Sequence, residues 1–219
     1  MILVLRSVLF TAICLGISST QAQITNDTAA PVASNRIIQV EFDDYFFPNT
    51  LRVDYYIAGD FKSESVYLNQ VKIEPYFSGP HKRLIDPFNS GTYRIAVFDS
   101  VSGTLLFTKG FNNLFQEWQG TPEARRVQRS FEQTAILPFP RQTIRLQVEK
   151  RKYSDGKFEN LFQMYINPND YFISRKKIRE IPFVKFHDSG EPENKVDIAF
   201  IAEGYTRDQM EKFVNLEQN

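Results

Sequence analysis

Single-residue alternation of apolar and polar side chains extends over most of this chain, from about residue 37 to residue 166. The clearest run contains Ile144, Leu146 and Val148, which alternate with charged or amide residues. A period of two places successive side chains on opposite faces of a strand, so that one face packs on a core and the other contacts water. The body of the chain is therefore predicted to consist of half-buried β-strands.

Clusters of Gly, Pro, Asn, Asp and Ser separate these runs, and such clusters are typical of turns. Their spacing predicts two hairpins, in which residues 92–98 pair with 104–108 and residues 143–152 pair with 157–166. About seven to nine antiparallel strands with alternating faces pack best as two sheets. The predicted fold class is all-β, an immunoglobulin-like antiparallel β-sandwich over residues 36–173.

The composition supports a packed core and excludes two classes of partner. The 20 Phe and 10 Tyr residues favour strands, because aromatic side chains pack well on a pleated surface. Lys and Arg together number 26, as do Asp and Glu, so the formal net charge is zero. Nucleic acids and acidic membrane surfaces attract a basic excess that this chain lacks, and neither is expected as a partner.

Residues 1–22 have the pattern of a cleavable signal peptide. Arg6 precedes an apolar stretch over residues 8–17, and the small residue Ala22 ends the polar segment that follows. The apolar stretch is too short for a mature membrane-spanning helix, which takes about 20 residues. The protein is therefore expected to be exported to the periplasm, the cell surface or the medium. Residues 23–35 are expected to form a flexible leader, and no membrane span is expected in the mature chain.

The single cysteine, Cys14, lies inside this signal peptide. A lipoprotein would carry its lipid on such a cysteine, but Ile13 is bulky where a small residue should precede it. The mature chain is therefore expected to contain no cysteine, which excludes disulfides, thiol catalysis and cysteine-bound zinc.

The sequence contains no recognisable catalytic or metal-binding pattern. Its two histidines, His81 and His187, lie far apart in a turn and in a linker, and both are interpreted as solvated loop residues. No H-E-x-x-H zinc helix, G-x-S-x-G nucleophile turn, calcium loop or glycine-rich phosphate loop occurs. We therefore assign no catalytic or metal-ligating residue and expect no cofactor in this chain.

Three residues are candidates for binding, namely Trp118, Glu117 and Glu203. Trp118, the only tryptophan, lies beside Glu117 and either plugs the space between two sheets or stacks on a sugar or peptide. Packing is the favoured interpretation. Glu203 either stabilises the positive end of a helix, which is favoured, or belongs to a later active site. The pair Asp43 and Asp44 is interpreted as a solubilising strand edge rather than a binding site.

Residues 195–219 have the pattern of the start of a second domain, joined to the sandwich by a linker over residues 174–194. The apolar run over residues 196–201 is typical of a strand buried in a parallel sheet. Thr206 and Gln209 have the spacing of a capping box at the start of a helix. The sequence thus predicts one strand and one helix of an incomplete α/β domain, loosely docked or disordered because the neighbouring strands are missing.

Three segments read, in this order along the chain, LFQEWQGTPEA, PFPRQTIRLQVEKR and KVDIAFIAEGYTRDQMEKF. Together they resemble the secreted bacterial metallopeptidases of the IgA peptidase family, metallopeptidase family 64. The resemblance implies an N-terminal sandwich domain followed by the first strand and helix of a peptidase domain. It also implies a zinc endopeptidase whose H-E-x-x-H-type helix comes well downstream. No zinc ligand or catalytic glutamate of the family maps onto a residue of this chain.

The resemblance therefore implies an accessory domain of a secreted zinc metallopeptidase, present as a fragment without the zinc site and inactive as it stands. Zinc is expected only in the full-length family. The expected partners are the missing peptidase domain and a protein or glycoprotein substrate. The alternative is a stand-alone secreted β-sandwich that binds a glycan or a protein through Trp118 and its tyrosine-rich strands. The substrate, the oligomeric state and the role of the sandwich stay open at this point.

Overall fold

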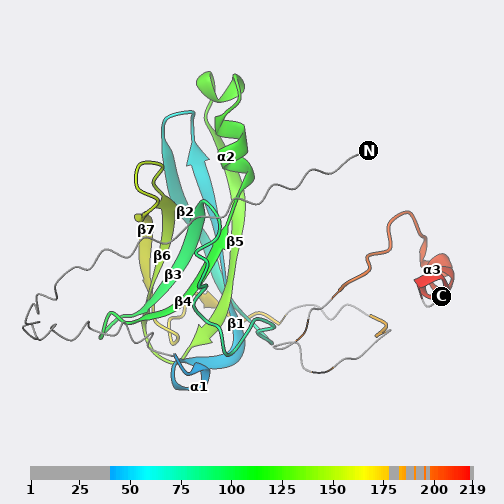
Figure 1. The fold of residues 1–219 in the computed structure, drawn as a ribbon. Coiled ribbons are helices and arrows are strands. Elements are labelled where there is room, and N and C mark those ends of the chain that lie inside the picture. The colour runs from blue at the N-terminus through cyan, green and yellow to red at the C-terminus, as the bar shows by residue number, and fades with distance from the viewer. Residues whose placement is uncertain (1–39, 178–182, 186–189, 191–194, 196–197, 218–219) are drawn as a thin grey trace, which may run out of the picture. The chain divides into compact units, whose positions relative to one another are not determined.

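The computed structural model describes residues 40–177, 183–185, 190, 195 and 198–217. The predicted signal peptide, the leader and most of the predicted linker lie outside these residues. Within the described residues the chain forms two four-stranded sheets and few helices (Figure 1). The all-β sandwich predicted from the alternation is confirmed.

The first sheet has the strand order β5-β1-β2-β8, and the second has the order β4-β3-β6-β7. None of the described helices has the length and apolar character that crossing a membrane requires. The elements follow one another as α1 (Phe42–Tyr45), β1 (Phe46–Gly59), β2 (Glu64–Glu74), β3 (Tyr93–Asp99), β4 (Leu105–Phe111), α2 (Leu114–Gln119), η1 (Glu123–Arg125), β5 (Arg129–Pro140), β6 (Ile144–Arg151), β7 (Phe158–Ile166), β8 (Ile173–Ser174), η3 (Arg207–Gln209) and α3 (Met210–Glu217).

Strand β1 is the central element of the first sheet, because it pairs antiparallel with β2 on one side and β5 on the other. Its alternating apolar residues are all buried and face the second sheet, as the period of two predicts. These residues are Leu51, Val53, Tyr55 and Ile57. Arg52 and Asp54 consequently lie on the opposite, outer face of the sheet.

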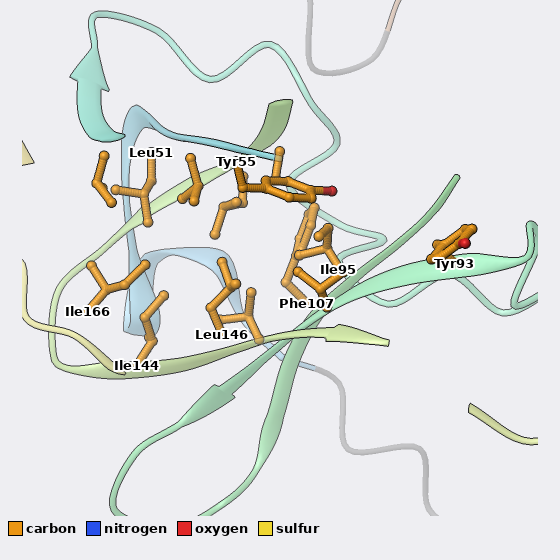
Figure 2. Close-up of a cluster of buried hydrophobic side chains, with 14 of the residues drawn as sticks. Leu51, Tyr55, Tyr93, Ile95, Phe107, Ile144, Leu146 and Ile166 are labelled. Carbon is orange, nitrogen blue, oxygen red and sulfur yellow. The ribbon is translucent and has the colours of Figure 1, made fainter. Parts of the chain in front are cut away.

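The core lies between the two sheets (Figure 2). Leu51 and Tyr55 from β1 belong to the same buried cluster as Ile95 from β3 and Leu146 from β6. Each buried side chain of this size stabilises the fold by about 1.5–3 kcal/mol relative to exposure. The sandwich thus has a core of its own, built from the positions that the alternation assigns to the inner face.

Both predicted hairpins are formed, as β3 with β4 and as β6 with β7. Strand β8 departs from the antiparallel pattern, because it pairs in parallel with β2 through Val71–Ile173 and Lys72–Ser174. Strand β5 lies at the edge of the first sheet. Its residues Pro138 and Pro140 lack a backbone N–H, and proline is confined to such edge positions.

The alternation that starts at about residue 37 predicts a strand through Val40 and Phe42. This prediction is wrong for its described residues, because residues 40–41 form no strand and a helix follows. Residues Phe42–Tyr45 form the one-turn helix α1, and the Phe46 amide donates to the Phe42 carbonyl. The Phe42 ring stacks on His81 with ring centroids 3.8 Å apart and contacts Phe46 at 5.8 Å. Packing of the Phe42 ring against residues distant in the sequence therefore favours a helical turn, although the local alternation of apolar and polar residues favours a strand. His81 is accordingly half-buried rather than a solvated loop residue.

Asp43 and Asp44 lie in the first turn of α1 and are exposed. The predicted strand edge is therefore not formed at these two residues. Acidic side chains in a first helical turn face the positive end of the helix dipole, which is a favourable position.

Gly110 of β4 allows a close approach between two backbone segments. A Cβ atom at this position would meet the carbonyl oxygen of Ser90 far inside van der Waals contact. We expect Gly110→Ala to lower the free energy of unfolding by about 1–3 kcal/mol, since the neighbour is backbone and cannot rotate away. Urea unfolding followed by circular dichroism measures this change.

Gly120 provides the matched control for this substitution. It has φ −73° and ψ −10°, and its nearest contact for an added Cβ is the Glu117 carbonyl oxygen at 3.4 Å. Gly120→Ala is expected to change the free energy of unfolding by less than about 0.5 kcal/mol. Equal effects at Gly110 and Gly120 would contradict the close-approach interpretation.

The C-terminal segment agrees with only part of its prediction. Residues 198–203 form no strand, so the strand predicted over residues 196–201 is wrong for its described residues, and residues 196–197 lie outside the description. A strand requires a hydrogen-bonded neighbour, and none of the described strands pairs with this segment. The predicted helix is present as η3 and α3. The Thr206 amide donates to Oε1 of Gln209 at 3.1 Å, which is one of the two bonds of the predicted capping box.

Candidate functional site

Helix α2 places the predicted candidate Trp118 inside the fold. Oδ1 of Asn113 accepts a hydrogen bond from the Gln116 amide at 2.8 Å and so caps the start of this helix. Trp118 is only 7% exposed, and its ring contacts Phe115 at 5.8 Å and Phe131 of β5 at 5.7 Å. The indole Nε1 donates to Oε2 of Glu123 at 2.9 Å. The structure thus places Trp118 as a plug, and little of its ring is exposed for stacking on a ligand.

The other two predicted candidates are exposed. Glu117 lies on the solvent side of α2, next to the buried Trp118. Glu203 lies shortly before the helix start at Thr206 and is also exposed. Among the residues that the structure describes, no group of three or more His, Cys, Asp or Glu side chains could hold a metal ion. The described residues therefore do not fit a zinc site.

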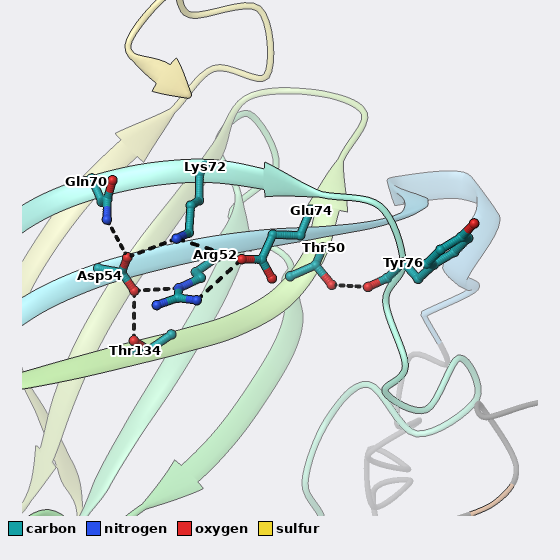
Figure 3. Close-up of polar contacts among 8 residues, drawn as sticks. All are labelled: Thr50, Arg52, Asp54, Gln70, Lys72, Glu74, Tyr76 and Thr134. Atoms are coloured by element: carbon teal, nitrogen blue, oxygen red, sulfur yellow. Dashed lines mark hydrogen bonds and ion pairs between the residues drawn. The ribbon is translucent and has the colours of Figure 1, made fainter. Parts of the chain in front are cut away.

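The main polar cluster, which sequence reasoning missed, lies on the outer face of the first sheet (Figure 3). We call it the Asp54 cluster, because the Asp54 carboxylate at its centre binds side chains from three adjacent strands. Oδ1 accepts from Arg52 Nε at 2.8 Å and from Thr134 Oγ1 at 2.7 Å. Oδ2 accepts from Gln70 Nε2 at 2.9 Å, and Lys72 Nζ lies 3.8 Å away.

The Asp54 cluster is balanced in charge. Arg52 and Lys72 also approach Glu74, at 3.4 Å and 3.9 Å, so that two cations face two carboxylates. The Asp54 side chain is only 1% exposed. Burial alone would raise the pKa of Asp54, but hydrogen bonds from Arg52 and Thr134 outweigh it and hold the pKa below its ordinary value of 3.8.

This geometry favours a structural role for Asp54. A general base or nucleophile needs an accessible oxygen close to a substrate. Both carboxylate oxygens of Asp54 are instead occupied by donors from β1, β2 and β5. The cluster therefore joins three strands on the side of the sheet that lies away from the core.

The lowered pKa of Asp54 predicts a dependence of stability on pH. A carboxyl group whose folded pKa is lowered contributes stability above its unfolded pKa, and that stability is lost as the pH falls through the folded value. The difference in free energy of unfolding between the wild type and Asp54→Asn should therefore be constant above about pH 5 and shrink below about pH 3.8. Urea unfolding between about pH 2.5 and 7 measures it, and a difference that stays constant throughout would contradict the role of the carboxylate charge.

A second polar cluster joins the two sheets. Glu64 begins β2, and its Oε2 accepts from the hydroxyl of Tyr93 in β3 at 2.9 Å. The same oxygen lies 2.8 Å from Nζ of Lys150 in β6. Burial, with a further contribution from the Glu64 carboxylate, raises the pKa of the Tyr93 hydroxyl, which therefore stays protonated as a donor. This cluster is a bridge between sheets rather than a reaction centre.

Exposed aromatic side chains form the remaining candidate surface. An exposed tyrosine offers both an apolar ring and a polar hydroxyl, which suits recognition of a partner. Within the sandwich and its turns, the most exposed rings belong to Tyr67, Tyr76, Phe88, Tyr153, Tyr165, Tyr171 and Phe172, and beyond β8 Phe183 is also exposed. Tyr171 and Phe172 are adjacent, and their ring centroids lie 4.0 Å apart.

Residues 41–163 match the family model described as peptidase M64 N-terminus, and this range is more than half of the 219-residue chain. The chain belongs to the peptidase M64 N-terminus family. The sequence resemblance is thereby confirmed at the level of the N-terminal domain of peptidase family 64. A comparison with curated proteins found no match.

The matched range of this M64 N-terminal domain contains the sandwich elements from α1 into β7. Asp54, Glu64 and Trp118, which organise the two polar clusters and the plug, all lie within it. Glu203, the adjacent rings Tyr171 and Phe172, and helix α3 lie beyond it. The family match therefore refers to the sandwich and its internal contacts.

Proposed function

We propose that this chain is the accessory N-terminal domain of a secreted zinc metallopeptidase of the IgA-peptidase type. The observation that carries the proposal is the match of residues 41–163 to the peptidase M64 N-terminus. The contacts of the sandwich agree with an accessory role, since its buried carboxylates are held by structural partners. The zinc and the catalytic glutamate would belong to a linked peptidase domain, and this chain alone would not hydrolyse a protein.

The proposal includes export by the signal peptide over residues 1–22. It is supported by the order of a basic residue, an apolar stretch and small residues in the sequence. The mature protein would then act in the periplasm, at the cell surface or in the medium. N-terminal sequencing of the exported protein should begin at Gln23, and an intact Met1 on the exported protein would refute the signal peptide.

A peptidase assay tests the proposed function. We expect no cleavage of casein or immunoglobulin A by this 219-residue chain with added zinc. The coding sequence beyond Asn219 should encode an H-E-x-x-H helix, and the longer protein should cleave a protein substrate in a manner that a chelator abolishes. Zinc-dependent cleavage by the 219-residue chain itself, or the lack of a zinc helix downstream, would overturn the proposal.

The second candidate function is a secreted sandwich that binds a glycan or a protein. The exposed tyrosines favour it, because Tyr76, Tyr153 and Tyr171 are each more than 80% exposed. The buried position of Trp118 does not support its original form, in which that ring contacts the ligand. Binding of the chain to a glycan or glycoprotein array would favour this function over the accessory role.

A further inference from the structure

Within the sandwich, two exposed aromatic rings are adjacent in sequence and in contact, those of Tyr171 and Phe172, which we call the exit pair. The two side chains are 84% and 72% exposed. Single exposed apolar side chains are common on protein surfaces, whereas contiguous exposed rings mark interaction sites. Two large rings in contact with each other and with solvent therefore require an explanation.

The exit pair is held in a defined position. Oδ1 of Asp170 accepts from the Phe172 amide at 3.0 Å, and the Asp170 carbonyl accepts from the Ile173 amide at 3.3 Å. Ile173 is buried and pairs with Val71 of β2, which fixes the chain directly after the two rings. A hydrogen-bonded turn between strands β7 and β8 thus holds the two rings in place. Binding a partner would therefore cost little conformational entropy in this turn.

The exit pair also lies where the chain leaves the sandwich. Strand β8 (Ile173–Ser174) is the last strand of either sheet, and it directly follows the pair. Nη2 of Arg175 donates to the Pro168 carbonyl at 2.7 Å, which holds the first residue after β8 against the same turn. Any domain that follows in the polypeptide is consequently tethered next to these rings.

We propose that the exit pair is the anchor of the docking surface for the peptidase domain that follows in the same polypeptide. This inference rests on the proposed function, since it needs that domain to exist. A linker of roughly 20 residues reaches at most about 70 Å even when fully extended, so a domain attached to it has an effective concentration in the millimolar range or above. A second copy of the chain at micromolar concentration would compete poorly for the same rings.

The exit pair is an anchor rather than a complete interface. Interfaces between domains of one chain bury about 600–1,500 Å², which is more than two rings supply. Tyr67 and Leu68 on β2, the strand with which β8 pairs, are 58% and 43% exposed and provide further apolar surface on this strand. Central aromatic anchors surrounded by weaker contacts are the usual arrangement in protein interfaces.

Nitration of tyrosines with tetranitromethane, followed by peptide mass spectrometry, tests the proposal. It is applied to the 219-residue chain and to the longer protein that includes the peptidase domain. Tyr153 is 91% exposed in the turn between β6 and β7 and is the internal control. In the 219-residue chain both tyrosines should react at similar rates. In the longer protein Tyr171 should react about tenfold more slowly, as expected for a surface that is covered about nine-tenths of the time, with Tyr153 unchanged.

A double variant provides the second measurement. In the longer protein, the double substitution Tyr171→Ser and Phe172→Ser should release the peptidase domain from the sandwich. The rate of tryptic cleavage of the linker should then increase about tenfold. The control pair, Tyr153→Ser with Phe88→Ser, removes one exposed tyrosine and one exposed phenylalanine elsewhere and should leave that rate unchanged. Circular dichroism should show the same sandwich in both variants.

The outcomes separate the two proposals. Equal nitration of Tyr171 in both proteins, together with zinc-dependent cleavage by the longer one, would overturn the docking proposal and leave the proposed function intact. Protection of Tyr171 in the 219-residue chain that rises with protein concentration would assign the surface to a second copy and also overturn it. A longer protein without peptidase activity would refute the proposed function, whatever the nitration result.

Discussion

Asp54→Ala is expected to lower the free energy of unfolding by about 3–5 kcal/mol, because it removes a buried carboxylate that accepts three side-chain hydrogen bonds. Arg52 of β1 and Lys72 of β2 are paired directly opposite each other and would face one another without the carboxylate between them. Like charges at such positions repel. Thr134 and Gln70 would also lose their acceptor. Urea unfolding at pH 7, with an unchanged slope against denaturant, measures the loss.

Glu74→Ala is the matched control within the same cluster. The Glu74 side chain is 20% exposed and lies 3.4 Å from Arg52 Nη1, at the rim of the network. Pairs of this kind contribute about 0–1 kcal/mol, so the control should remain close to the wild type. If both substitutions lower the free energy of unfolding equally, Asp54 is not the centre of the cluster. The three strands would then be joined by their backbone hydrogen bonds alone.

The alternation of apolar and polar residues predicts the strands and their inner faces. It does not show whether a polar side chain on the outer face is exposed to solvent or buried by neighbouring side chains. The alternation of β1 places Asp54 on the outer face, where it does lie. It is nevertheless buried, because β1 has neighbours on both sides and their long side chains cover the carboxylate. The available signal was the occurrence of Asp in the middle of a long strand, where this residue is disfavoured.

Contacts between distant parts of the chain explain where local prediction fails. The one-turn helix at Phe42 forms because its ring packs on Phe46 and His81, and His81 is remote in the sequence. Residues 198–203 have the composition of a buried strand, yet composition cannot supply a hydrogen-bonded neighbour. The link from Glu64 to Lys150 between the sheets likewise depends on register, which no local pattern encodes.

The packing of Trp118 is the part of the candidate site that sequence reasoning predicted best. It was the only tryptophan in a segment with two phenylalanines, and a large ring near other rings favours burial. Its hydrogen bond to Glu123 was not predicted, because a turn brings this residue back to the indole. Glu123 in turn pairs with Arg129 at the start of β5 at 2.9 Å, so that α2, η1 and β5 are held together around the plug.

Trp118→Ala is expected to lower the free energy of unfolding by about 3–5 kcal/mol, since it leaves a cavity among buried aromatic rings. Phe115 and Phe131 would lose their contact, and the Glu123 carboxylate would lose a donor. A typical domain has a total stability of about 5–15 kcal/mol, so the variant should unfold at a much lower urea concentration. Circular dichroism during urea titration measures the shift.

Two controls assign this loss to packing. Trp118→Phe keeps one ring in the plug but removes the bond to Glu123 and part of the buried indole, so we expect a smaller loss of about 1–2 kcal/mol. Tyr153→Ala removes a ring that is 91% exposed and should change the free energy of unfolding by less than about 0.5 kcal/mol. A Trp118→Ala protein as stable as the wild type but unable to bind a glycan would contradict the plug and support a binding role for the indole. A strongly destabilised variant would support the packing role of Trp118.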